Sequence, residues 1–341
     1  MGNWSWLLFE RARNACLALF KIVPAHLDRP LSVRSSGAAR RFQWAVFLAG
    51  ALTVAGTEAQ QKEFPVVHPF SGTLQKIYDS GVIRVGHREN SPPFAFLDAK
   101  RHPIGYSLDL CEVVVEEIAR HLHKEDLKTD YVPVTPENRF ELVKSGAVDI
   151  ECGSTTASAE RRATFGFSPT LFVTGAKLLV KRGSGIVSLR GLQGKTAVLT
   201  KGTIHAETIP KIAQQQNLAI QFVFADDHNQ SFETLAAGKA DAFINDEVQL
   251  HGMMAARDVE TDYRVVGDFL TYADYALMFR RDDSEFAEVI RHAFERLAGS
   301  REIRAIYRRW FQRPLPSGVS LNLPMSPHLE HVFQLQGLAA D

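Results

Sequence analysis

The chain has 341 residues, 45% of them hydrophobic and 23% charged, which is enough to bury a substantial core and to form two compact lobes. Lysine plus arginine and aspartate plus glutamate each total 39, so there is neither the basic excess of a nucleic-acid binder nor the acidic excess of a solvating tail. With three cysteines, no CxxC motif and no His or Cys cluster at metal-ligand spacing, the sequence argues against a disulfide-built scaffold and against a zinc site.

Residues 1–59 are predicted to be a leader sequence. An uncharged apolar run over residues 42–56 follows Arg40 and Arg41, which is the arrangement of a secretory signal peptide. This run is shorter than the roughly 20 apolar residues that a membrane-spanning helix needs, so a retained N-terminal anchor is the less favoured alternative. We therefore expect the protein to be exported to the periplasm.

Two cysteines belong to the part of the chain that follows the leader. Export would place Cys111 and Cys152 in an oxidising compartment, where disulfides form and persist. Their positions in the sequence do not determine whether they pair with each other. We expect them to stay unpaired.

The first half of the exported chain alternates β-rich runs with runs of helical period, the pattern of parallel sheets covered by helices. The helix predicted over residues 107–122 has apolar residues three and four positions apart and Ser107 as its N-cap. Gly146 ends the following helix. Strands are predicted at residues 82–87, 129–134 and 147–153, and helices at residues 107–122 and 137–145.

A second run of the same kind follows an extended stretch over residues 170–182. A later extended stretch, residues 270–281, could join the first one as a hinge between two lobes. After Pro314 the Pro-rich tail is predicted to wrap the surface. Strands are predicted at residues 195–200, 220–226, 240–246 and 275–281, and helices at residues 204–216, 230–237, 286–299 and 301–311.

These elements predict an α/β fold with two lobes, each a mostly parallel sheet with flanking helices, joined by a two-strand hinge. The first lobe is expected to combine two separate parts of the chain, because the last strand returns after the second run. The expected boundaries are residues 73–174 plus 275–316 for lobe 1, 178–270 for lobe 2 and 317–341 for a C-terminal tail.

Polar residues follow the predicted strands repeatedly. In open α/β sheets, ligands bind outside the carboxyl ends of the strands. Arginines, hydroxyls, a histidine and a carboxylate gathered there would suit a ligand with two anionic groups and one cation. The candidate residues are Arg88, Ser154, Thr155, Thr156, Thr203, His228 and Asp246 at strand ends, with Arg139 and Arg161 on the helical stretches that come next.

Each of these residues also has a purely structural interpretation. Arg88 and Arg139 could be ordinary surface charges. The hydroxyls of residues 154–156 could be helix caps, because helical residues follow them. His228 could lie in a loop without a ligand, and Asp246 could cap the next helix. The spacing alone leaves these alternatives open.

Several segments together resemble the periplasmic glutamate/aspartate-binding proteins of the polar amino-acid uptake family. The resemblance runs from about Thr73 to Pro316 and includes GTLQKIYDSGVIRVGHRENSPPF, VTPENR, LTKGT and ADDHNQSFETLAAGKADAFINDE. Its most specific parts are GHRE, ECGSTT with a following ER, and DH-x-x-SF. A signal peptide ahead of these segments agrees with the export of that family.

The resemblance implies a role for each candidate residue. Arg161 would hold the α-carboxylate of an amino acid as a bidentate fork, because a planar guanidinium matches a carboxylate. The hydroxyls and amides of Ser154 and Thr156 would assist it. Asp246 would bind the α-ammonium group. The side-chain carboxylate would be surrounded by Arg88, Arg139 and His228, while Thr155 and Thr203 complete the set of candidate ligand contacts.

The chain departs from the family pattern at two positions. Ile204 stands where the family tends to carry a second hydroxyl, and Pro136 stands where a hydroxyl is often found. Both changes affect the groups that would contact a carboxylate. Glutamate, aspartate and a related dicarboxylate therefore stay open as the exact ligand.

The resemblance implies a solute-binding protein that captures glutamate or aspartate and delivers it to an ABC permease in the inner membrane. We expect a monomer that closes around its ligand, with no catalytic group, metal, cofactor or nucleic-acid partner. One alternative is a periplasmic enzyme on the same fold, similar to cyclohexadienyl dehydratase, although no catalytic triad or nucleotide loop stands out. The other is the ligand-sensing module of a receptor.

Overall fold

The computed structural model describes residues 69–337, all of which belong to one compact unit. The predicted leader over residues 1–59 lies outside the described residues. In the part of the chain that the structure describes, no helix is long and apolar enough to cross a membrane.

The first of two main sheets combines strands from both ends of the described chain. Strand β1 lies between β5 and β6 and pairs in parallel with both, whereas β14 pairs antiparallel with both β6 and β7. The strand predicted at residues 82–87 is confirmed without a shift. The strand order is β5 (Lys128–Pro133), β1 (Val82–His87), β6 (Ile150–Glu151), β14 (Met278–Arg280) and β7 (Phe165–Phe167).

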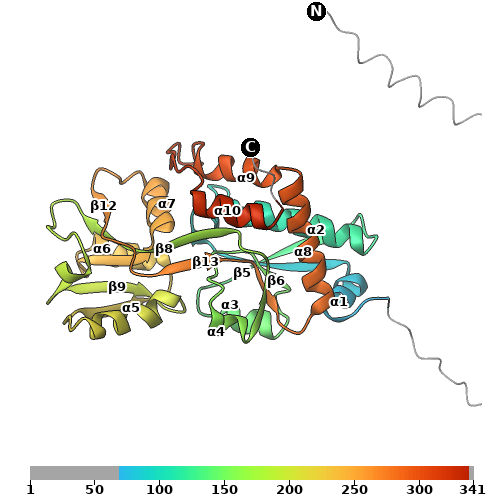
Figure 1. Cartoon of the computed structure of the whole chain (residues 1–341), viewed down its shortest axis with the longest axis horizontal. Coiled ribbons are helices and arrows are strands. Elements are labelled where there is room, and N and C mark those ends of the chain that lie inside the picture. Colours follow the sequence, from blue (N-terminus) through green and yellow to red (C-terminus); the bar gives the residue numbers. More distant parts are fainter. Residues whose placement is uncertain (1–68, 338–341) are drawn as a thin grey trace, which may run out of the picture. The chain divides into compact units, whose positions relative to one another are not determined.

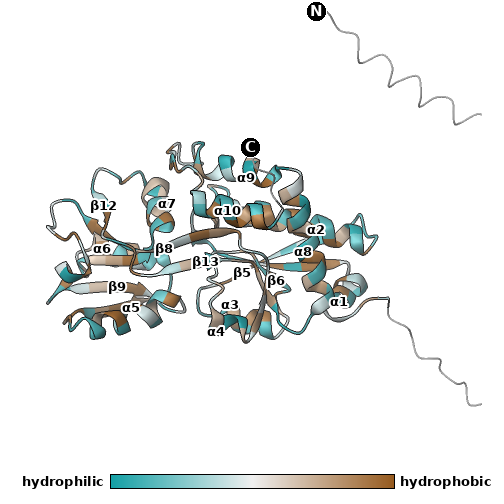
Figure 2. Cartoon of the chain, viewed as in Figure 1, coloured by the Kyte–Doolittle hydropathy of each residue, from teal (hydrophilic) through white to brown (hydrophobic). Residues whose placement is uncertain are grey.

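Helices cover both faces of this sheet. Figure 1 shows α2, α8, α9 and α10 on one side of the sheet and α3 and α4 on the other. Their apolar faces, brown in Figure 2, turn toward the sheet, so the core of the lobe lies between these layers. The helices are α1 (Gly72–Ser80), α2 (Tyr106–His121), α3 (Arg139–Lys144), α4 (Ala159–Arg162), α8 (Ser284–Gly299), α9 (Glu302–Phe311) and α10 (Pro327–Leu335).

The second sheet has the same combination of parallel and antiparallel pairs. β9 pairs in parallel with β10 and β11, and β8 pairs antiparallel with β11 and β12. Separate apolar clusters fill its two faces, one beneath α5 and one beneath α6 and α7. The strands in order are β10 (Gln221–Ala225), β9 (Thr196–Thr200), β11 (Ala242–Asp246), β8 (Phe172–Lys181) and β12 (Tyr263–Val266), and the helices are η1 (Leu189–Leu192), α5 (Ile204–Gln215), α6 (His228–Ala236) and α7 (Glu247–Arg257).

Two extended segments run between the sheets. The second half of β8 belongs to the second sheet, and its first half pairs antiparallel with β13 (Tyr272–Tyr275). The sequence predicted a single strand over residues 275–281, but the structure divides this region into β13 and β14. The division arises because the chain leaves its partner β8 and enters the first sheet. A small third sheet consists of β2 (Asn90–Ser91), β3 (Ala95–Leu97) and β4 (Pro103–Ile104).

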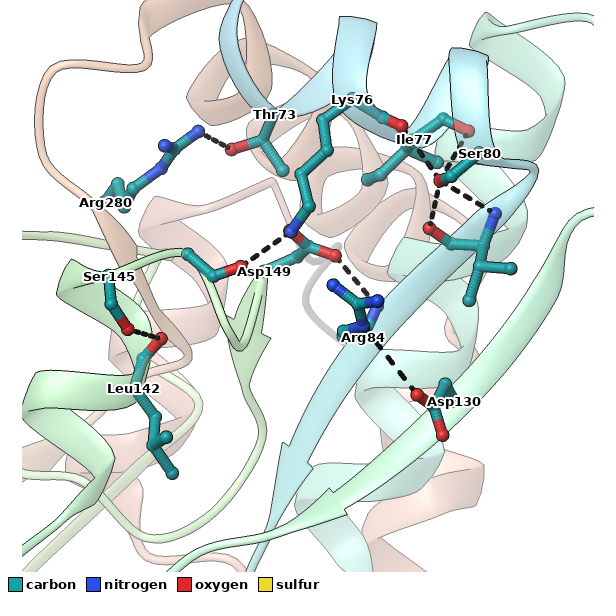
Figure 3. A network of polar contacts seen from close by, with 12 residues as sticks. Thr73, Lys76, Ile77, Ser80, Arg84, Asp130, Leu142, Ser145, Asp149 and Arg280 are labelled. Atoms are coloured by element: carbon teal, nitrogen blue, oxygen red, sulfur yellow. Dashed lines mark hydrogen bonds and ion pairs between the residues drawn. The ribbon is translucent and has the colours of Figure 1, made fainter.

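A buried carboxylate fixes the start of the first lobe. Asp149, 3% exposed, accepts a hydrogen bond from Lys76 Nζ at 2.6 Å and one from the backbone N–H of Arg84 at 2.8 Å. Lys76 also donates to the carbonyl oxygen of Gly146 at 2.6 Å (Figure 3). These bonds join α1, β1 and the turn before β6, and they satisfy a charge that would be costly to bury alone.

Two local predictions were wrong. Ser107 does not cap α2, because the N-cap is Gly105 and Ser107 lies buried inside the helix. Gly105 is required there since its φ is 143° and an added Cβ would lie 2.1 Å from the carbonyl oxygen of Phe94. The C-terminal tail also contains a helix that the sequence analysis missed, α10, which buries Leu329 and Phe333 against the first lobe.

Cys111 and Cys152 form a disulfide, contrary to our expectation that they stay unpaired. Cys111 lies on the buried face of α2, and Cys152 directly follows β6 in the sheet that α2 covers. Packing this helix on this sheet brings their Cα atoms to 6.1 Å, within the range that a disulfide spans. Sequence spacing could not reveal this proximity because it depends on how the helix packs.

We predict that the disulfide stabilises the fold. Replacing both cysteines with Ala should lower the free energy of unfolding by up to about 4 kcal/mol, because the bond closes a loop between positions 41 residues apart. Urea denaturation of the oxidised protein measures this change. Reductant should destabilise the unmutated protein to a similar extent and leave the double variant unaffected. Equal midpoints for all samples would contradict the prediction.

Candidate functional site

Three arginine side chains are buried close to one another. Arg88 follows β1, Arg139 is the first residue of α3 and Arg161 lies in α4, and they are only 2%, 2% and 9% exposed. Burial, and secondly the charge of Arg139, lower the pKa of Arg88 to about 9 and that of Arg161 to about 10. Arg139 is therefore the common neighbour of the other two. The surface-charge interpretation of Arg88 and Arg139 is wrong.

The second lobe contributes a carbonyl group to two of these arginines. Arg139 and Arg161 donate to the carbonyl oxygen of Gly202 at 3.2 and 3.4 Å, and the carbon of each guanidinium lies 4.8 Å from the centre of the Phe140 ring. Gly202 follows β9 with a φ of 68°, and an added Cβ would lie 2.5 Å from the carbonyl oxygen of Pro136. The two lobes thus meet directly beside the arginines.

His228 is the first residue of α6 and is 2% exposed. Its Nδ1 lies 2.9 Å from the hydroxyl of Thr200, which in turn lies 2.7 Å from the hydroxyl of Ser231. Burial holds the pKa of His228 well below 6.5, and the charges of Arg88 and Arg139 lower it further. The imidazole is therefore neutral at neutral pH and contributes hydrogen bonding without adding positive charge.

Asp246 closes β11 with a carboxylate that has one oxygen in use and one without a partner. Its Oδ2 accepts a hydrogen bond from the Tyr275 hydroxyl at 2.5 Å and lies 3.0 Å from His205 Nε2. Gln249 donates to the same tyrosine oxygen at 3.0 Å. Oδ1 is buried without a partner, and the side chain makes no capping bond to α7. The capping interpretation of Asp246 is therefore wrong.

The hydroxyls of residues 154–156 are not helix caps either. The N-cap of α4 is Ser158, whose side chain accepts a hydrogen bond from the backbone of the first turn. The Thr155 hydroxyl donates to Glu151 Oε2 at 2.6 Å. Glu151 itself is fully buried at the end of β6.

Almost all of the candidate residues line one small cavity between the lobes. The space that protein atoms leave free there, including the part that is open to solvent, is about 250 Å³. Thr155 is the one candidate that does not line it. The hydroxyl of Thr203 is used locally, because it donates to the carbonyl oxygen of Thr200 and caps α5. The lining residues are Arg88, Arg139, Ser154, Thr156, Arg161, Thr203, Ile204, His205, His228, Asn245, Asp246 and Gln249.

Four lining residues were not among the candidates. Asn245 precedes Asp246 in β11, so the rule about strand ends could have included it. Gln249 lies one helical turn further on and accepts a hydrogen bond from the Asn245 side chain at 2.9 Å. His205 and Ile204 lie in the first turn of α5, and no spacing signal distinguished His205 from other helical residues. Among residues 69–337, no group of His, Cys, Asp and Glu could hold a metal ion.

Comparison with known proteins identifies the family of this chain. Residues 83–313 match the family model of bacterial extracellular solute-binding proteins, family 3. The chain belongs to this family. The match covers most of both lobes and ends shortly before the segment that carries α10.

Two curated relatives of this family 3 protein are named for binding glutamate and aspartate or for their import. The L-glutamate/L-aspartate-binding protein of Pseudomonas aeruginosa is 38% identical over 270 residues, which cover 79% of this chain and 89% of the relative. The glutamate/aspartate import solute-binding protein of Escherichia coli is 35% identical over 263 residues, covering 77% and 87%. These relatives are solute-binding proteins and not enzymes, which bears against the dehydratase alternative.

Solved structures support the two-lobed α/β fold. A substrate binding protein of an ABC uptake transporter from Streptococcus pneumoniae, solved with bound histidine, superposes with a TM-score of 0.63. It is 21% identical, and the match covers 70% of this chain and 96% of that structure. At this identity the likeness concerns the fold.

In this family 3 protein the lobes also meet at a second place. Gly252 of α7 packs against the first lobe so closely that an added Cβ would lie 2.2 Å from the carbonyl oxygen of Pro92. Nearby, the Asn90 side chain donates to Asp227 Oδ2 at 3.4 Å. Backbone contacts at Gly202 and Gly252 therefore set how closely the two lobes approach each other.

The buried neutral state of His228 predicts a pH dependence of stability. An unfolded chain binds a proton at His228 below about pH 6.5 whereas the folded chain does not, so this histidine's contribution to stability is present above that pH and is lost as the pH falls. His228→Gln should reduce the slope of unfolding free energy against pH, between pH 6 and 5, by up to about 1.4 kcal/mol per unit. Urea denaturation at several pH values, without ligand, measures this slope.

A matched control is His328→Gln, which changes an exposed histidine. Its slope should equal that of the unmutated protein. His87 and His251, whose pKa values burial also lowers, remain in both variants and keep part of the slope. An unchanged slope in His228→Gln would show that this histidine is not held neutral.

Proposed function

We propose that this protein captures an acidic amino acid, glutamate or aspartate, between its two lobes and delivers it to an ABC permease. The observation that carries the proposal is the charge of the buried site. Three buried guanidinium groups line the cavity together with the buried carboxylate of Asp246, and the charge of the buried Glu151 carboxylate acts on all three from outside the cavity lining. One net positive charge remains, and an acidic amino acid at neutral pH carries one net negative charge.

A neutral amino acid would leave that charge uncompensated. An uncompensated charge in a buried site costs several kcal/mol. Each charge-assisted hydrogen bond to an anionic ligand, by contrast, stabilises the complex by about 1.5–3 kcal/mol. Glu207, which lies 3.9 Å from Arg161, is half exposed and screened by solvent, so it does not replace an anionic ligand. The names of the two relatives above agree with an acidic ligand.

The free hydrogen-bonding groups suggest how an amino acid would be oriented. Oδ1 of Asp246 is an unused acceptor and suits the α-ammonium group. Arg161, whose Nη1 donates to the carbonyl oxygen of Thr156 at 3.2 Å, would hold the α-carboxylate with Ser154 and Thr156. Arg88, Arg139 and neutral His228 would then surround the side-chain carboxylate.

We also propose the domain limits and cellular setting given by the sequence. Residues 73–174 plus 275–316 form lobe 1, residues 178–270 form lobe 2, and β8 with β13 serves as the hinge. The protein works as a monomer in the periplasm, after export by its N-terminal signal. The closed form is what the inner-membrane permease recognises.

Arginine substitutions test the site. Arg161→Ala should remove measurable binding of every amino acid tested, because every amino acid has an α-carboxylate. Arg139→Ala should weaken glutamate and aspartate by about 2–5 kcal/mol, or roughly 30-fold or more, and affect neutral amino acids less. Isothermal titration of the ligand-stripped protein measures both effects.

The control for these variants is Arg190→Ala, which changes an exposed arginine of η1 in the second lobe. It should bind like the unmutated protein. Unchanged affinities in Arg161→Ala and Arg139→Ala would rule out this site. Binding of glutamine or arginine in preference to glutamate would rule out the acidic ligand.

Closure of the lobes can be tested with a matched pair of helical glycines. Gly252→Ala places a methyl group 2.2 Å from the Pro92 carbonyl oxygen, and we expect this clash in the closed form of the protein. Overpacking of this kind costs about 1–3 kcal/mol, so ligand affinity should fall roughly 5- to 150-fold. Gly299→Ala in α8 meets no atom within 4 Å and should leave ligand affinity unchanged. A helical Gly→Ala change also raises stability by up to about 1 kcal/mol, so the two variants are compared by their ligand affinity. If Gly252→Ala binds the ligand with the same affinity as the unmutated protein, the contact between Gly252 and Pro92 is not part of closure.

A further inference from the structure

Glu151 is a fully buried carboxylate that stands just behind the cavity. It ends β6, its exposed fraction is 0%, and it is not one of the residues that line the cavity. A Cβ added at Gly153 would lie 2.3 Å from Glu151 Oε1 and 2.9 Å from Cγ of Arg88. The carboxylate and the stem of this arginine therefore flank the same glycine, and only a glycine leaves room for both.

The contacts of Glu151 are not those of a carboxylate that holds the fold together. Within residues 69–337 the one hydrogen bond of its side chain is the 2.6 Å bond from the Thr155 hydroxyl to Oε2, and Oε1 has no partner. No ion pair joins it to a described cation, whereas Asp149 in the same lobe is paired with Lys76 at 2.6 Å. A buried, incompletely bonded carboxylate is costly to retain for structure alone.

What surrounds Glu151 is the arginine cluster. Its negative charge acts on Arg88, Arg139 and Arg161 alike and partly offsets the effect of burial on the pKa of each. The carboxylate influences all three at longer range without pairing with any one of them. It therefore leaves their guanidinium groups available to a ligand while reducing the total positive charge of the site.

We propose that Glu151 is a specificity-determining residue that makes the site select acidic amino acids over dicarboxylates without an ammonium group. This inference rests on the proposed function. With Glu151 the site keeps one net positive charge, which matches glutamate. A dicarboxylate such as glutarate carries two negative charges, and one of them would remain unbalanced beside the free oxygen of Asp246.

Glutamate and glutarate form a matched pair of probes because glutarate has the same five-carbon dicarboxylate chain without the ammonium group. In Glu151→Gln the site gains one positive charge and keeps an oxygen that can accept from Thr155. The ratio of the Kd of glutarate to the Kd of glutamate should fall about tenfold or more, since a unit charge acts strongly across a buried site. Isothermal titration of the full exported chain with both ligands gives this ratio.

Thr155→Val is the control for a merely structural role. It removes the hydrogen bond to Glu151 but leaves the charge of the site unchanged, so its ratio of Kd values should stay close to that of the unmutated protein. Thermal unfolding verifies that both variants are folded. If both ligands weaken by the same factor in Glu151→Gln, or if Thr155→Val shifts the ratio equally, the inference is wrong.

The two proposals fail in different ways. An unmutated protein that binds neither glutamate nor aspartate would overturn the proposed function. An unmutated protein that binds glutamate, together with an unchanged ratio in Glu151→Gln, would overturn only the role of Glu151. A ratio that falls in Glu151→Gln and not in Thr155→Val supports both proposals.

Discussion

Mutual repulsion among three buried guanidinium groups is the constraint on which this structure depends. Arg88, Arg139 and Arg161 come from three separate elements of one lobe, and each loses most of its hydration. Such a cluster is stable only if carboxylates, carbonyl groups and neutral donors surround it. Glu151 supplies a carboxylate from the same lobe, and Gly202 supplies a carbonyl group from the other. The contact between the lobes is thus also part of the charge balance.

This constraint links binding to closure in physical terms. Under the proposed function, the Gly202 carbonyl reaches the arginines when the lobes close, and the cluster then has one positive charge in excess. A ligand that supplies the missing charge therefore favours the closed arrangement over the open one, which is how a ligand shifts a conformational equilibrium. A neutral His228 fits the same logic, because a charged imidazole beside Arg88 and Arg139 would add to the repulsion.

The sequence predicts the elements of this fold better than their packing. Apolar residues three and four positions apart located α2 because they form its buried face, and a β-rich run located β1. It could not reveal that Cys111 meets Cys152, which depends on the packing of α2 on the sheet. The rule about strand ends found Arg88 and Asp246, but it missed Glu151 because the strand was predicted to run on to residue 153, whereas β6 ends at Glu151. A carboxylate that acts from behind the cavity leaves no pattern in the sequence.

The strand that joins the lobes has a direct part in the site. Tyr275, the last residue of β13, forms a bridge with Thr156 and donates its hydroxyl hydrogen to Asp246. Tyr275 of β13 therefore contacts both Thr156 of the first lobe and the Asp246 carboxylate of the second lobe. The proposed contacts to the α-carboxylate and α-ammonium groups are built on this strand, whereas Arg88 and His228 face each other from opposite lobes. Groups common to all amino acids would then be held near the hinge, and the groups that distinguish acidic side chains would be brought together only by closure.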